Sequence, residues 1–153
     1  MSYIPELIIT VGIPGCGKST WVNQHKAYVK KLFLYKRLYT LGRPLCGAFV
    51  VCPDDIRKEL TGDITDQSKN NEVWEIAKTR VRAWLNNKYD VILDATNVST
   101  KGRRSFIEGL PECKLFAQCF PIAPEEAYAR IKKDLDNGVD RSVVPEELVY
   151  RMY

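Results

Sequence analysis

Residues Leu7–Thr20 have the sequence LIITVGIPGCGKST, and this stretch decides the fold. Its first part, Leu7–Val11, is apolar and rich in β-branched residues, which predicts a buried strand. Residues Gly12–Ser19 then fit the phosphate-binding pattern G-x-x-x-x-G-K-[ST], and Ser19–Lys26 has the composition of a helix start. A tight loop between strand and helix points backbone N–H groups and the positive helix terminus at one spot. The stretch therefore predicts a nucleotide phosphate site.

The positions of this loop have separate expected roles. Glycines let the backbone approach phosphate oxygens without a Cβ atom in the way. Lys18 is expected to reach the β- and γ-phosphates of ATP, and the Ser19 hydroxyl to bind Mg²⁺. The residues predicted to contact ATP are Gly12, Pro14, Gly15, Cys16, Gly17, Lys18, Ser19 and Thr20. A glycine-rich turn that matches by chance is the alternative, and the flanking strand and helix argue against it.

The composition is that of an ordinary globular domain. The chain has 153 residues, 45% hydrophobic and 27% charged, and we expect a single domain over residues 1–153. No apolar run is long enough to span a membrane, and Met1–Glu6 lacks the pattern of a signal peptide. The five cysteines form no C-x-x-C pair, which favours reduced thiols in the cytoplasm over a zinc site. A net charge of +4 is too small to indicate a nucleic-acid partner by itself.

The rest of the chain alternates between strand and helix patterns. Strands are predicted over residues 48–52, 89–94 and 114–120. Helices are predicted over 53–60, 73–85, 100–110 and 124–135, with a last one opening at Pro145. Together with the first strand, this alternation predicts an α/β fold, a P-loop-type parallel sheet of about four strands with helices on both faces.

The first helix is expected to start near Gly17 and to extend as far as Tyr39. Between Lys26 and Arg43 the sequence has six basic residues and no acidic one. A solvated helix face explains this run, and so does a surface that follows the phosphate backbone of a nucleic acid. The sequence leaves these two interpretations open.

Acidic side chains follow the second and third predicted strands. In a parallel sheet the carboxyl ends of the strands share one edge, where ligands bind, so Asp54 and Asp94 should lie near the P-loop. We interpret Asp54 as the general base that takes the proton of an acceptor hydroxyl. Arg57 lies three residues on and would hold an acceptor phosphate or steady Asp54. The alternative is that Asp54 caps its helix and that Arg57 lies on the surface.

Asp94 has the position of an acid that orders Mg²⁺ in P-loop proteins, so Ser19 and Asp94 are the predicted metal residues. Asp94 could instead cap the turn at Thr96 and Asn97. Four further arginines are candidates. Arg103 and Arg104 could bind a substrate phosphate or lie on a solvated helix start, and Arg130 and Arg141 flank a late loop that could close over the nucleotide.

The motifs resemble, in order and over nearly the whole chain, the kinase domain of polynucleotide 5′-hydroxyl kinases from phage and bacterial RNA-repair systems. The matching segments are Gly12–Trp21, Asp54–Arg57, Leu93–Val98, Asp140–Arg141 and Val144–Glu147. The resemblance implies that Asp54 is the general base, that Arg57 binds a 3′-phosphate of the acceptor and that Arg141 is a lid arginine. The position of a second lid arginine of some members is occupied by Gly138.

The predicted function is therefore an ATP- and Mg²⁺-dependent kinase for 5′-hydroxyl ends of RNA or DNA. The catalytic residues would be Lys18, Asp54, Arg57 and Arg141, with Arg141 also contacting ATP. Two alternatives stay open. One is a P-loop kinase of a small molecule such as a sugar, nucleoside or antibiotic, and the other is a nucleotide-binding module without transfer activity.

Overall fold

The computed structural model describes residues 3–25, 48–139, 141 and 144–153. Its strands are β1 (Glu6–Val11), β2 (Phe49–Val51), β3 (Val91–Leu93) and β4 (Lys114–Cys119). Residues 18–25 are helical, and the later helices are α2 (Pro53–Thr61), α3 (Asn70–Asn86), α4 (Thr100–Ile107), α5 (Pro124–Asp136) and α6 (Glu146–Met152).

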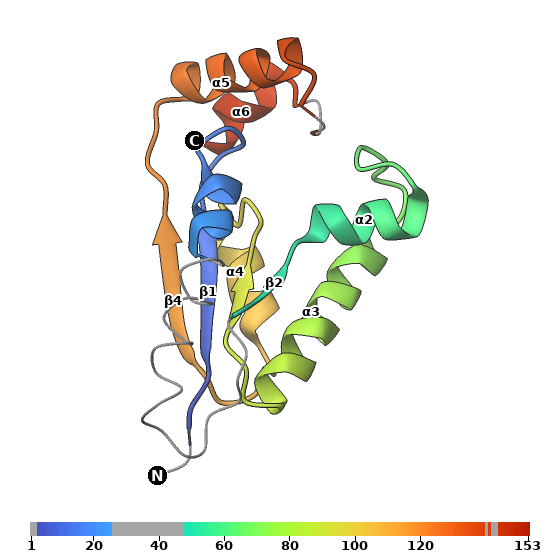
Figure 1. The fold of residues 1–153 in the computed structure, drawn as a ribbon, viewed down its shortest axis with the longest axis vertical. Coiled ribbons are helices and arrows are strands. Elements are labelled where there is room, and N and C mark those ends of the chain that lie inside the picture. The colour runs from blue at the N-terminus through green and yellow to red at the C-terminus, as the bar shows by residue number, and fades with distance from the viewer. Residues whose placement is uncertain (1–2, 26–47, 140, 142–143) are drawn as a thin grey trace.

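The strands form one parallel sheet in the order β2-β3-β1-β4. Ile9 of β1 is level with Leu93 of β3 and with Ala117 of β4, so the inner strands end close together. Figure 1 shows α5 and α6 above the carboxyl ends of β1 and β4, and α2 beside the end of β2. The predicted fold class is confirmed, and the predicted site residues fall at this edge of the sheet.

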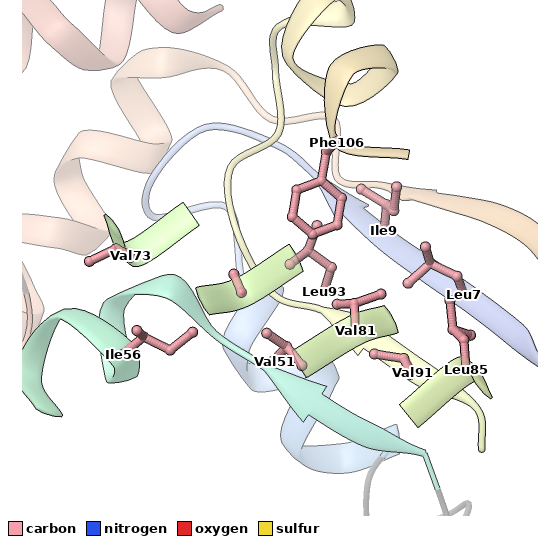
Figure 2. Close-up of a cluster of buried hydrophobic side chains, with 11 residues drawn as sticks. Leu7, Ile9, Val51, Ile56, Val73, Val81, Leu85, Val91, Leu93 and Phe106 are labelled. Carbon is pink, nitrogen blue, oxygen red and sulfur yellow. The ribbon is translucent and has the colours of Figure 1, made fainter. Parts of the chain in front are cut away.

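The main hydrophobic core lies between the sheet and α3 (Figure 2). One face of the strands contributes alternate residues, because side chains of a strand point to opposite sides in turn. These are Leu7, Ile9, Val51, Val91 and Leu93. The helix contributes Val73, Ala77, Val81 and Leu85, spaced four apart on one stripe and at most 1% exposed. This packing fixes where the sheet ends and where α3 begins.

Two segments differ from the sequence prediction. Tyr89 and Asp90 were expected in the third strand but belong to the turn after α3. The Tyr89 N–H donates to the carbonyl of Trp84, and the Asp90 carboxylate accepts the N–H of Glu6 at 2.8 Å. The predicted first helix is seen over 18–25, and its expected continuation to Tyr39 lies outside the described residues, as does the basic stretch Lys26–Arg43.

Within the described residues, no helix is both long and apolar enough to cross a membrane.

Candidate active site

The P-loop is tied to the loop that follows β3. Asn97 donates from Nδ2 to the carbonyl of Thr10 at 2.9 Å, and Gly12 donates its N–H to the carbonyl of Thr96 at 2.9 Å. Thr10 is fully buried, and its hydroxyl lies 2.9 Å from the carbonyl oxygen of Ala95. Thr96 and Asn97 therefore do more than shape their own turn, because they fix the strand end from which the P-loop starts.

The glycines of the loop meet two different environments. A Cβ atom on Gly15 would lie 2.4 Å from the carbonyl oxygen of Ala127 in α5, so helix backbone packs directly on the loop there. Among the described residues beyond its chain neighbours, a Cβ atom on Gly17 would have only a guanidinium nitrogen of Arg130 within 4 Å, at 3.9 Å. Both residues have positive φ, +83° and +97°, a conformation that glycine adopts without strain. The loop is thus supported on the Gly15 side and open on the Gly17 side.

Lys18 is held in the loop by its own backbone. The Nζ atom donates to the carbonyls of Gly12 at 2.9 Å and Ile13 at 2.8 Å, and it lies 3.4 Å from the sulfur of Cys16. An ammonium group has three donors, and a thiol sulfur is a weak acceptor. One strong donor is therefore left for a phosphate oxygen, on a side chain whose residue is only 9% exposed.

Ser19 and Asp94, the two residues predicted to bind a metal ion, are joined by a hydrogen bond. Asp94 is 9% exposed, and burial raises the pKa of its carboxyl group, while Lys18 and a hydrogen bond from Ser19 oppose that rise. The charges of Asp54 and Asp55 also raise the pKa of Asp94. Among the described residues, no group of three or more His, Cys, Asp or Glu side chains could hold a metal ion. Ser19 with the single carboxylate of Asp94 still fits Mg²⁺, which is usually bound by one or two carboxylates together with substrate phosphates.

Asp54 and Arg57 form an ion pair on the first turns of α2, between Oδ1 and Nη1. The N-cap of α2 is Cys52, so the alternative in which Asp54 caps the helix is wrong. The Asp54 side chain is 49% exposed and can meet a hydroxyl from solvent. Burial raises the pKa of the neighbouring Cys52 to about 12, which keeps this thiol protonated at neutral pH, so that it does not serve as a base there.

Arg57 is buried, with 5% exposure, and so does not lie on the surface. Its Nη2 atom donates to Oδ1 of Asn70, the first residue of α3, at 3.2 Å. Its Nε atom is buried and has no hydrogen-bond partner within the part of the chain that the structure describes. A buried donor without a partner carries a free-energy penalty of about 1–3 kcal/mol that a bound oxyanion would relieve. The Arg57 guanidinium is therefore oriented by Asp54 and Asn70, and its Nε remains as a donor without a partner among the described residues.

The other candidate arginines are spread out. Arg103 donates to the backbone carbonyl of Val98 at 2.9 Å and to Thr100 at 3.0 Å, so it braces the loop after β3. Arg141 pairs with Asp134 at the end of α5, and its buried Nε has no partner among the described residues. Arg130 lies four residues before Asp134 on α5, and its Nη1 lies near Gly17.

Asn70 and the contact of α5 with the P-loop were not predicted. Asn70 lies thirteen residues from Arg57, and no sequence pattern links the two positions. In the sequence, the candidate arginine Arg130 was the signal that pointed to α5. The contact itself depends on the small residue Ala127, three positions earlier, which allows the helix backbone to approach Gly15.

Known structures share this fold. In the Pnkp1/Rnl/Hen1 RNA repair complex, a chain aligns with 99% of this chain and 44% of its own length, with a TM-score of 0.73 and 21% identity. A second structure of that complex aligns with 85% of this chain and 40% of its own, with a TM-score of 0.63 and 26% identity. The APS kinase CysC of Mycobacterium tuberculosis, solved with AMPPNP and APS, aligns over 88% and 72%, with a TM-score of 0.58 and 15% identity.

A curated relative, the signal recognition particle 54 kDa protein of Sulfurisphaera tokodaii, is 29% identical over 135 residues. These residues make up 86% of this chain, which spans about a quarter (26%) of that relative. The chain has the P-loop-type α/β fold of these solved structures. The family model described as AAA domain matches residues 7–153, and the chain belongs to this family.

Proposed function

We propose that this protein is a kinase that transfers the γ-phosphate of ATP to the 5′-hydroxyl of RNA or DNA ends. The observation that carries the proposal is the Asp54–Arg57 ion pair, which presents a half-exposed carboxylate beside a buried guanidinium with an unpartnered donor. A carboxylate can accept the proton of an alcohol, and a guanidinium recognises phosphate. A polynucleotide end offers both partners, a 5′-hydroxyl and a phosphate, within one nucleotide.

In the proposed reaction, the 5′-oxygen bonds to the γ-phosphorus as the bond to the β-phosphate oxygen breaks. The hydroxyl proton passes to the free oxygen of Asp54, and ADP leaves. Lys18 would neutralise charge on the transferring phosphoryl group, and Arg57 would hold the acceptor so that its hydroxyl lies in line. Mg²⁺, held at Ser19 with Asp94 nearby, would supply further positive charge when bound.

Arg57→Ala should raise the KM for 5′-hydroxyl oligonucleotides about tenfold or more, because a charge-assisted contact to phosphate is lost. The measurement is phosphorylation with γ-labelled ATP over a salt titration. Binding of a polyanion releases counterions, so the wild-type KM should rise steeply with salt, and more steeply than that of the variant. A nucleoside 3′-phosphate should likewise be a much better acceptor than the plain nucleoside for the wild type only.

The matched control is Arg82→Ala, which removes an equal charge from an exposed position on α3 near Gly109. It should leave the KM and the salt slope unchanged. Asn70→Ala should raise the KM for oligonucleotides as Arg57→Ala does, but by a smaller factor. Asn71→Ala, at the next residue, which is exposed, should leave the KM unchanged. Activity on a sugar or nucleoside, without phosphorylation of any 5′-hydroxyl oligonucleotide, would favour a small-molecule kinase instead.

Arg141→Ala should lower kcat/KM for ATP several-fold, since the proposal gives this arginine a contact with the nucleotide phosphates. In the structure its Nη1 is paired with Asp134, so a purely structural role is the competing explanation. Asp134→Ala separates the two, because it removes the pair but leaves the guanidinium. Steady-state kinetics should show loss of kcat/KM in Arg141→Ala and little change in Asp134→Ala. Equal losses of kcat/KM in both variants would mean that Arg141 stabilises the end of α5 through its pair with Asp134 and does not contact ATP.

A further inference from the structure

The side chain of Asn97 fastens the loop after β3 to the end of β1. The pairing of β1 with β3 ends where Ile9 is level with Leu93, so Thr10 lies one residue beyond it. The Nδ2 atom of Asn97 donates to the carbonyl of Thr10 at 2.9 Å and takes the place of a further strand residue. Asn97 has a φ of +47°, a left-handed conformation that asparagine adopts more readily than most other residues. The loop therefore turns at Asn97 in a way that lets the amide reach the strand.

Arg103, on the first turns of α4, holds the same turn of the loop. Its Nη1 atom donates to the carbonyls of Asn97 and Val98, the latter at 2.9 Å, and its Nη2 atom lies 3.0 Å from the hydroxyl of Thr100. The ion pairs of the described residues do not include Arg103. The dipole of a helix disfavours a cation near its N-terminus, so the position itself does not stabilise the charge. The guanidinium instead uses its donors to fix the backbone at Asn97.

The loop that these side chains hold begins at Asp94, one of the two residues predicted to bind a metal ion. The Asp94 N–H donates to the carbonyl of Val51 in β2 at 2.9 Å, and its carboxylate accepts a hydrogen bond from Ser19. Ser19 belongs to the P-loop, which follows β1, whereas Asp94 belongs to the loop after β3. The separation of the two side chains therefore depends on how the second loop is fastened to β1, and Asn97 and Arg103 supply the side-chain part of that attachment.

We infer that Asn97 and Arg103 are positioning residues that set the distance between Ser19 and Asp94, and through it the affinity for Mg²⁺ beside the bound nucleotide. Mg²⁺ requires near-ideal octahedral geometry, so its binding is sensitive to small shifts of a ligand. Replacement of a residue that orients a metal ligand typically changes metal affinity or activity about 10- to 100-fold. The inference rests on the nucleotide and Mg²⁺ binding of the proposed function and is independent of which acceptor the enzyme uses.

The test is titration calorimetry of ATP binding to the full chain, once with Mg²⁺ and once with EDTA. The ratio of the two affinities measures the coupling between metal and nucleotide. In Arg103→Ala and Asn97→Gly this ratio should fall about tenfold or more, while the affinity in EDTA stays that of the wild type. Glycine is chosen at position 97 because it keeps the positive φ without strain. Arg103→Lys should recover part of the ratio, since an ammonium group can still donate to a loop carbonyl.

The direction of the effect separates positioning from charge. By Coulomb's law, the loss of a positive charge does not weaken the binding of a cation, so a lower ratio in Arg103→Ala is opposite to the effect of the charge alone. Lys101→Ala is the matched control, because it removes the same charge from an exposed residue of the same helix. Lys101→Ala should not lower the ratio, and thermal unfolding should report every variant folded.

Three results would overturn the inference. The first is a wild-type ratio in either Arg103→Ala or Asn97→Gly. The second is an equal loss of ATP affinity in Mg²⁺ and in EDTA, because the contacts would then support the P-loop itself and not the metal site. The third is a wild-type protein whose ATP affinity does not depend on Mg²⁺. The experiment contains no acceptor, so failure of the polynucleotide proposal would leave its outcome unchanged.

Discussion

Lys18→Ala should reduce phosphoryl transfer about a thousandfold or more, the largest loss expected from a single change in this chain. The Nζ atom is fixed by two loop carbonyls at 2.8–2.9 Å and cannot be replaced by solvent at the same position. A cation preorganised at the bridging phosphates stabilises charge that develops in the transition state, and it does so in a site that excludes water. The measurement is single-turnover transfer of labelled phosphate to an oligonucleotide.

The control must separate lost charge from a disturbed loop, because Lys18 also bonds the loop to itself. Lys18→Met keeps an unbranched side chain of similar length without the charge. It should be as inactive as Lys18→Ala, while its unfolding temperature stays closer to that of the wild type. Wild-type rates in either variant would show that the P-loop does not act on the transferred phosphate.

The P-loop and the parallel sheet were predictable because their signals are local. A β-branched run, three glycines and a lysine within Leu7–Thr20 specify strand, turn and helix start without help from the rest of the chain. Asp54 and Asp94 were predictable for a related reason. Each follows a strand, and a parallel sheet brings such positions to one edge whatever the loops between them contain.

Contacts between distant elements were not predictable. Tyr89 and Asp90 look like strand residues, but the Tyr89 N–H donates to the carbonyl of Trp84 in α3, and the carboxylate of Asp90 accepts the N–H of Glu6 in β1. The roles of the arginines were equally hidden. Arg130 and Arg141 lie on the same late segment, yet only the packing of α5 on Gly15 decides which one faces the loop. Periodicity reports which face of a helix is apolar, whereas the partner of that face is a property of the whole fold.

Asp54→Asn should lower turnover roughly a hundredfold or more, the usual scale for loss of a general base, with little change in ATP affinity. The amide keeps the shape and can still accept a hydrogen bond from Arg57, but it cannot take the hydroxyl proton. Loss of an ion pair with a buried guanidinium is a second possible cause of lower activity, since Arg57 is only 5% exposed. The experiment therefore needs a control for position and a control for folding.

Asp55→Asn is the positional control, because Asp55 is the next residue of α2 and is exposed. It removes the same charge near Asp94 without touching Arg57. Turnover should fall much less than in Asp54→Asn, and thermal unfolding should show both variants folded. Asp54→Glu is a third variant. It restores a carboxylate base, displaced by one methylene group, and should recover part of the turnover rate. Equal losses at positions 54 and 55 would mean that negative charge near Asp94 matters and that proton transfer to Asp54 does not. A loss confined to Asp55→Asn would move the base to that residue.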